Sequence, residues 1–130
     1  MPRAQPKMNG TANFEVTPGQ RLRVFQRAVI PGEVIIHDDS QLYIARLSNI
    51  SAGGVFIEDV TMLPAGAQVR VVVKSPKLDG AVQATGTVVR IEKDGRRGVA
   101  VEFTSISSKA REVIQNCVFE TRMETALKVV

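Results

Sequence analysis

The sequence contains far more valine and isoleucine than leucine, and this imbalance limits the folds that are open to it. Val and Ile together number 28, whereas Leu numbers 6. Branching at Cβ restricts a side chain in a helix but suits the pleated surface of a sheet. At 130 residues, the chain is long enough to bury the core of one domain. We therefore expect a single domain that is all-β in the main.

Six candidate strands, separated by turn residues at short intervals, make up most of the chain. In the last of them Val99, Val101 and Phe103 alternate with Ala100 and Glu102, which is the period-2 pattern of a half-buried strand. Several short strands with regular turn signals are typical of a small barrel or sandwich. The candidate strands cover residues 33–38, 42–49, 54–58, 69–74, 82–91 and 98–103.

A helical pattern replaces the strand pattern after Phe103. Apolar residues recur at helical spacing and form one stripe, which consists of Ala110, Val113, Ile114, Cys117 and Val118. Ser107 or Ser108 can cap the N-terminus of this helix. The stripe drifts onward through Phe119, Met123, Ala126, Leu127 and Val130. We expect the first two turns to cover the barrel, and the drifted half to be a candidate contact with another subunit in a homo-oligomer.

These patterns divide the chain into three parts. Residues 1–18 are rich in Pro, Asn, Thr and Gly and are predicted to form a flexible N-terminal tail that ends at a Pro-Gly turn. Residues 19–118 form the β domain with the first part of the helix. Residues 119–130 are either a helix extension or a tail.

The sequence contains one cysteine, Cys117, and one histidine, His37. One Cys permits no internal disulfide and no Cys-based metal site, and one His cannot form a His cage. No activated nucleophile lies near His37 in the sequence, so we interpret it as a strand-end residue rather than a general base. The acids at 38–39 and 58–59 are typical of solvated turn charges. We therefore do not expect an enzyme, a metal or a cofactor.

The N-terminal residues and the lengths of the apolar stretches indicate where in the cell the protein is expected. No apolar stretch is longer than a few residues, so no segment is expected to insert into a membrane. The first seven residues contain no apolar segment of the kind found in signal peptides. We expect a cytoplasmic protein.

The net charge of +4 is confined to the N-terminal segment. Residues 1–27 carry five basic side chains and one acidic side chain, 5 − 1 = +4, and the remaining residues carry 12 of each sign. Within the segment, Arg21, Arg23 and Arg27 are clustered. A neutral body with one short arginine cluster favours a small anion over long nucleic acid as the partner.

Arg23 and Arg27 are the first candidate binding residues. A separation of four places both on one face of either a strand or a helix. Guanidinium groups repel one another unless an anion lies between them, and their planar donors suit phosphate. The alternative is a solvated polar face on an edge strand.

The second candidate is the segment from Asn49 to Gly54. Asn49 and Ser51 are two residues apart, so at a strand end they point the same way. Gly53 and Gly54 permit positive φ and close approach of a ligand to the backbone. The alternative is an ordinary polar turn, because Asn, Ser and Gly are common turn residues.

Together the two motifs, in this order and spacing, resemble those of the PilZ domain, namely RxxxR followed by (Asp/Asn)-x-Ser-x-x-Gly. The resemblance covers residues 21–118 and includes the strand at 98–103, which is similar to the closing strand of that family. It implies a six-stranded antiparallel β-barrel with a C-terminal α-helix, acting as a receptor for the second messenger cyclic di-GMP. The ligand-binding residues that it implies are Arg23, Arg27, Asn49, Ser51 and Gly54, with Arg21 and Gly53 as secondary candidates.

A receptor of this kind is expected to act in trans on an unidentified protein effector and to regulate motility, pili or exopolysaccharide. Residues 14–27 are expected to become ordered when the ligand joins the arginines to the barrel. One alternative is a single-stranded nucleic-acid-binding barrel, which needs aromatic platforms, whereas this chain has 5% aromatic residues and no Trp. The other alternative is a PilZ-like protein-interaction module that does not bind nucleotide.

Overall fold

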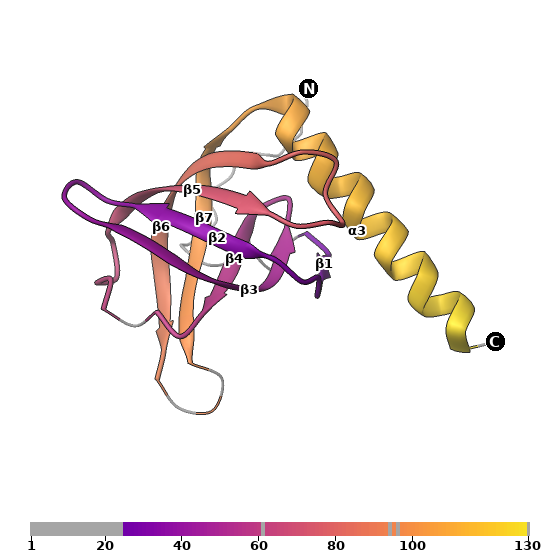
Figure 1. Ribbon diagram of the computed structural model, residues 1–130, viewed down its shortest axis with the longest axis horizontal. Helices are drawn as coiled ribbons and strands as arrows, with labels where there is room; N and C mark the ends of the chain where they lie inside the picture. Colours follow the sequence, from indigo (N-terminus) through magenta and orange to yellow (C-terminus); the bar gives the residue numbers. More distant parts are fainter. Residues whose placement is uncertain (1–24, 61, 94, 96, 130) are drawn as a thin grey trace, which may run out of the picture.

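The computed structural model describes residues 25–60, 62–93, 95 and 97–129 of the chain. The described elements are seven strands followed by a helix (Figure 1). In chain order they are β1 (Arg27–Ala28), β2 (Glu33–His37), β3 (Leu42–Ser51), β4 (Gly54–Glu58), β5 (Gln68–Lys74), β6 (Val82–Glu92), β7 (Gly98–Ile106) and α3 (Ser108–Val129).

Strands β2 to β7 close into an antiparallel barrel. The neighbours run β3-β2-β5-β6-β7-β4, and β4 pairs with β3 again to complete the ring. The predicted six-stranded antiparallel β-barrel with a C-terminal helix is confirmed, with one added strand. This strand, β1, pairs with the end of β3 through Arg27 opposite Ser51 and Ala28 opposite Ile50. A strand of two residues is too short to show a periodic pattern, so the sequence analysis missed β1.

The barrel interior is filled by one residue in every two along each strand. In β5, for example, Val69, Val71 and Val73 are buried, whereas Arg70 and Lys74 are exposed. Each fully buried Val or Ile contributes roughly 1.5–3 kcal/mol relative to an exposed one. The core therefore uses the β-branched residues that dominate the sequence. They include Val34, Ile36, Ile50, Val55, Ile57, Val82, Val88, Val99 and Val101.

The helix α3 begins at the predicted cap. The Ser107 hydroxyl accepts a hydrogen bond from the Ala110 amide at 3.0 Å, as an N-cap side chain does. Ile114, Cys117 and Val118 are buried against the barrel core. Beyond Val118 the helix continues to Val129 and extends away from the barrel (Figure 1). Residues 119–129 are thus a helix extension rather than a tail.

Two β-bulges interrupt the alternation of strands β3 and β6. In β3 the register passes from Leu47 opposite Ile57 to Asn49 opposite Phe56, which leaves Ser48 as the extra residue. In β6 it passes from Val88 opposite Val101 to Arg90 opposite Ala100, which leaves Val89 as the extra residue. Simple alternation from buried Leu47 and Val88 would turn residues 49 and 90 inward. The bulges turn Asn49 and Arg90 to the outer face, as bulges commonly re-aim a side chain.

One glycine allows strands β4 and β7 to approach closely. A Cβ atom on Gly98 would lie 2.1 Å from the carbonyl oxygen of Ile57 on the neighbouring strand. The residue also has φ = +156°, which side-chain-bearing residues rarely adopt. Glycine is therefore required at the start of β7.

Candidate functional site

The structure brings one residue of each predicted motif into contact. The Arg27 guanidinium donates from Nη1 to Oδ1 of Asn49 at 3.4 Å, across 22 residues of sequence. Arg27 lies opposite Ser51 in the sheet, so the side chains of Arg27, Asn49 and Ser51 share the outer face of the barrel. The face is at the end where β1 and the β3–β4 hairpin meet.

Several predicted features lie outside the described residues, namely Arg21, Arg23, the tail at 1–18 and most of the segment 14–27. Arg27 belongs to that segment but is already part of β1, paired with β3. Pairing with β3 and burial of the neighbouring Ala28 hold this end of the segment on the barrel. The ordering of residues 14–27 by a ligand stays a prediction.

The Ser51 side chain lies inside the hairpin turn. It is 1% exposed, and its Oγ accepts a hydrogen bond from the Gly53 amide at 3.1 Å. The hydroxyl also faces the Gly54 carbonyl at 3.5 Å. The Gly53 carbonyl in turn accepts a hydrogen bond from the Phe103 amide at 2.9 Å. Ser51 therefore sets the shape of the turn beside Arg27 and Asn49.

The two glycines of the turn lie next to this hydroxyl. Gly54 pairs with Ser51 on one side and with Glu102 of β7 on the other. Among the described residues, the glycines with positive φ are Gly66, Gly80, Gly95 and Gly98. Gly53 and Gly54 thus do not use the left-handed conformation that the sequence analysis allowed for them. Their contribution is the bare backbone beside Ser51.

Sequence reasoning missed Phe56 and Arg90, which stand in the same cross-strand row as Asn49. Asn49 is opposite Phe56, Phe56 is opposite Ala100, and Ala100 is opposite Arg90. The Phe56 ring is 4% exposed, and the guanidinium carbon of Arg90 lies 5.9 Å from its centroid. The bulge at Val89 hid Arg90 from a period-2 analysis.

Arg90 has an ionic neighbour but an incomplete set of hydrogen bonds. Its Nε lies 2.6 Å from Oε2 of Glu92, yet the N–H is not directed at that oxygen, and the buried Nε has no hydrogen-bond acceptor. The contact with Glu92 is thus an ion pair that holds one edge of the guanidinium. The Arg90 side chain is 36% exposed.

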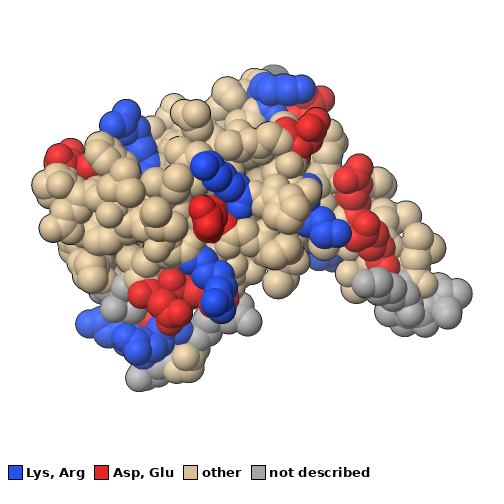
Figure 2. All heavy atoms as spheres, in the orientation of Figure 1, with Lys and Arg blue, Asp and Glu red and all other residues tan. Residues whose placement is uncertain are grey.

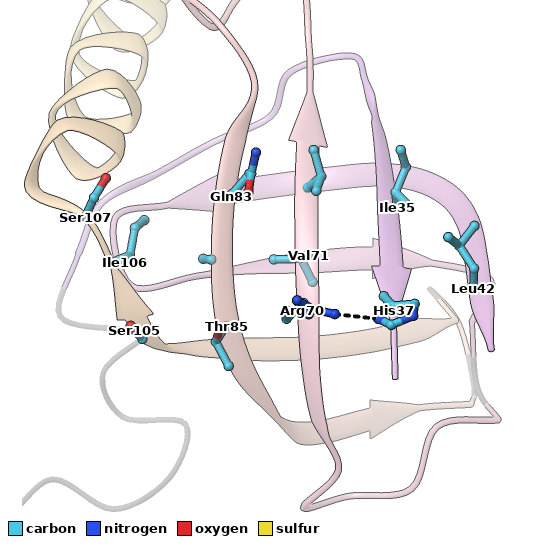
Figure 3. A pocket seen from close by; sticks show the side chains of 12 residues that line it. Ile35, His37, Leu42, Arg70, Val71, Gln83, Thr85, Ser105, Ile106 and Ser107 are labelled. Atoms are coloured by element: carbon cyan, nitrogen blue, oxygen red, sulfur yellow. Dashed lines mark hydrogen bonds between the residues drawn. The ribbon is translucent and has the colours of Figure 1, made fainter. Parts of the chain in front are cut away.

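A hollow on the outer surface of the barrel is formed mainly by residues of β2, β5, β6 and β7 (Figure 3). It measures about 480 Å³ and is lined by Ile35, Leu42, Arg70 and Thr85, among others. At its edge, Nη2 of Arg70 is 3.2 Å from Nδ1 of His37; the arginine can only donate, so this ring nitrogen accepts. None of the predicted binding residues lines the hollow.

Charged side chains are interspersed over the face of the molecule in Figure 2, where basic and acidic groups lie next to each other. This visible face presents no continuous basic surface of the kind that long nucleic acids need. Over the described part of the chain, no three His, Cys, Asp or Glu side chains are grouped to hold a metal ion. No helix in the same part is long and apolar enough to cross a membrane.

Two side chains with shifted pKa values, Cys117 and Asp38, lie away from the candidate site. Burial raises the pKa of the Cys117 thiol, although a contact with Thr121 opposes this effect. Hydrogen bonds from the backbone amides of Ser40 and Gln41 lower the pKa of Asp38 in the β2–β3 turn. The causes of both shifts are local contacts within α3 and the β2–β3 turn, so neither group belongs to the candidate site.

Comparison with known proteins finds one matching family and several similar folds. The model of one protein family, described as PilZ domain, matches residues 21–120. None of the curated protein sequences compared with the chain matches it. The similar solved structures include the inhibitor of motility MotI/DgrA of Bacillus subtilis, with 21% identity and a TM-score of 0.63. The match covers 74% of this chain and 49% of that one.

Two further structures come from YcgR of Escherichia coli. YcgR in complex with c-di-GMP has 16% identity and a TM-score of 0.67, with 81% of this chain and 48% of that chain covered. The PilZ domain of YcgR with c-di-GMP has 15% identity and a TM-score of 0.59, with 81% and 95% covered. The chain therefore spans about half the length of MotI and YcgR, and nearly all of the separate domain.

Proposed function

Because the chain belongs to the PilZ domain family, we propose that it is a receptor for cyclic di-GMP. The observation that carries the proposal is the contact between Arg27 and Asn49 at 3.4 Å, which joins the two motifs on one outer face. The similar YcgR structures are complexes with c-di-GMP. The proposed site comprises Arg23, Arg27, Asn49, Ser51 and Gly54, with Arg21 and Gly53 beside them.

Each residue type suits one part of a cyclic dinucleotide. Arginine donates two parallel hydrogen bonds to a phosphate or to the O6 and N7 atoms of guanine. The Asn49 amide can both donate to and accept from a guanine edge. Ser51 holds the turn through its bond to Gly53, and the glycines let a base approach the backbone. The domain thus acts by binding, without a chemical step.

The output is proposed to pass in trans to a protein effector that regulates motility, pili or exopolysaccharide. We further propose that the second half of α3 is the contact of a homo-oligomer. This half extends beyond the barrel and exposes Phe119, Met123 and Leu127, which lie four residues apart on one helix face. Sedimentation equilibrium measures the mass in solution and tests this contact.

Isothermal titration calorimetry with cyclic di-GMP tests the proposed function. We expect the wild type to bind cyclic di-GMP and not a short single-stranded oligonucleotide. Arg27→Ala should weaken binding about tenfold or more, because a hydrogen bond to a charged group is worth roughly 1.5–3 kcal/mol. The control is Arg46→Ala, which removes an exposed arginine of β3 that pairs with Glu58.

Two results would overturn the proposed function, and a third would change the proposed site. Absence of binding by the wild type would favour the protein-interaction module. Preference for the oligonucleotide would favour the nucleic-acid-binding barrel. Equal affinity of the wild type and Arg27→Ala would remove Arg27 from the site.

A further inference from the structure

We propose that Arg90 is a third ligand-binding arginine, and that the plane of its guanidinium stacks on one guanine base of the bound dinucleotide. The inference rests on the proposed function and adds a residue that belongs to neither motif. It is carried by the sheet register, by the packing of Arg90 on Phe56, and by the charge and exposure of the guanidinium.

The two β-bulges place Arg90 on the same outer face as the candidate site. Ser48 and Val89 are the extra residues of β3 and β6, and each turns the next residue outward at the same cross-strand row. That row runs Asn49, Phe56, Ala100, Arg90. Both bulges thus act on the same cross-strand row, and together they bring Asn49 and Arg90 to one outer face.

Arg90 contacts the side chain of Phe56 in this row. Its backbone lies on β6, three strands from Asn49, but its guanidinium carbon is 5.9 Å from the centroid of the Phe56 ring. Phe56 is on β4, the strand next to Asn49. The Phe56 ring packs on Ala100, and its tip lies beside Gly98 of β7, so the ring is turned toward β7. The Arg90 guanidinium is thus about two to three strand spacings, roughly 10–15 Å, from Asn49, a span that the two bases of a cyclic dinucleotide can bridge.

The Arg90–Phe56 pair presents the guanidinium, rather than the ring, to a ligand. The ring is 4% exposed and covers Ala100, whereas the Arg90 side chain is 36% exposed. Glu92 engages the Nε edge and so orients the group without covering its plane. An arginine plane that is already packed on an aromatic ring is a suitable stacking surface for a base.

The experiment measures the affinity for cyclic di-GMP of the wild type, Arg90→Lys and Arg90→Met by calorimetry. Lysine keeps the positive charge but has no plane, and methionine keeps an unbranched apolar side chain without the charge or the plane. Loss of one stacked base should weaken binding about tenfold in both variants. The matched control is Arg70→Met, which removes an exposed arginine from β5 at the hollow beside His37; its affinity should equal that of the wild type. Thermal melting checks that all variants fold.

The outcomes separate this inference from the proposed function. If the wild type binds and both Arg90 variants bind about tenfold more weakly, the inference is supported. If Arg90→Lys binds like the wild type, only charge matters and stacking is refuted. If both Arg90 variants bind like the wild type, Arg90 is a structural cover for Phe56 and the site stands without it. If the wild type does not bind, the proposed function fails and this inference fails with it.

Discussion

Replacing Ser51 with alanine should destabilise the domain through a single hydrogen bond. The hydroxyl is the acceptor for the Gly53 amide at 3.1 Å, and both residues are buried. Alanine fits the strand end but leaves that N–H without an acceptor and away from water. The second contact of the hydroxyl, with the Gly54 carbonyl, is 3.5 Å long and contributes less.

The cost follows from the desolvation of the orphaned amide. An unsatisfied buried polar group costs about 1–3 kcal/mol, so we expect a loss of about 2 kcal/mol in the free energy of unfolding. For a domain of this size 1 kcal/mol corresponds to about 4 °C in Tm, so the melting temperature should fall by about 8 °C.

Urea denaturation followed by circular dichroism measures the difference, and Ser75→Ala is a matched control. The Ser75 hydroxyl accepts the amide of Lys77 at 3.0 Å, two residues on, but this bond is exposed. Water can replace the acceptor there, so Ser75→Ala should cost less than about 0.5 kcal/mol. Equal stabilities of the two variants would refute the argument that burial of the Ser51 bond matters.

Two other predictions concern the barrel and the helix. Gly98→Ala should lower the free energy of unfolding by about 3 kcal/mol or more, because its Cβ would lie 2.1 Å from the Ile57 carbonyl oxygen; a urea midpoint within error of the wild type would contradict this. Burial raises the pKa of the Cys117 thiol, so iodoacetamide should modify it far more slowly in the native protein than in urea. The folded state holds this proton more tightly, so the stability contribution is complete below the thiol pKa of the unfolded chain. This contribution to the free energy of unfolding is lost as the pH rises through the thiol pKa of the folded protein. An iodoacetamide reaction rate that is the same in the native protein and in urea would contradict the burial of Cys117.

The sequence predicted the barrel well because long stretches of its strands alternate regularly and its turns are marked. Val99, Val101 and Phe103 alternate as the inner residues of β7, and all three are buried. The Ser107 cap was one of two candidates, and the structure selects it through its bond to Ala110. Local patterns of period 2 and 3.6 were sufficient wherever one element kept a single register.

The site was predictable only in part, because the orientation of its other residues depends on how the strands pair. Arg27 and Asn49 carried a motif, and the structure places them in contact. Arg90 carried none, since its outward orientation comes from the bulge at Val89, and a bulge has no fixed signature in sequence. Ser51 had the right position, but its burial against the turn depends on the neighbouring strands.

The shortness of β1 has a consequence for motion at the binding face. This strand contributes two residue pairs to the sheet, so it can open locally at much lower free energy than the longer barrel strands. Ala28 and Ile30 are buried in the core, and these two anchors limit how far such an opening spreads. Amide hydrogens of β1 should therefore exchange with solvent sooner than those of β5 or β7. Arg27, beside Asn49, lies in this short strand, so a ligand that holds Arg27 should slow the exchange of the β1 amides.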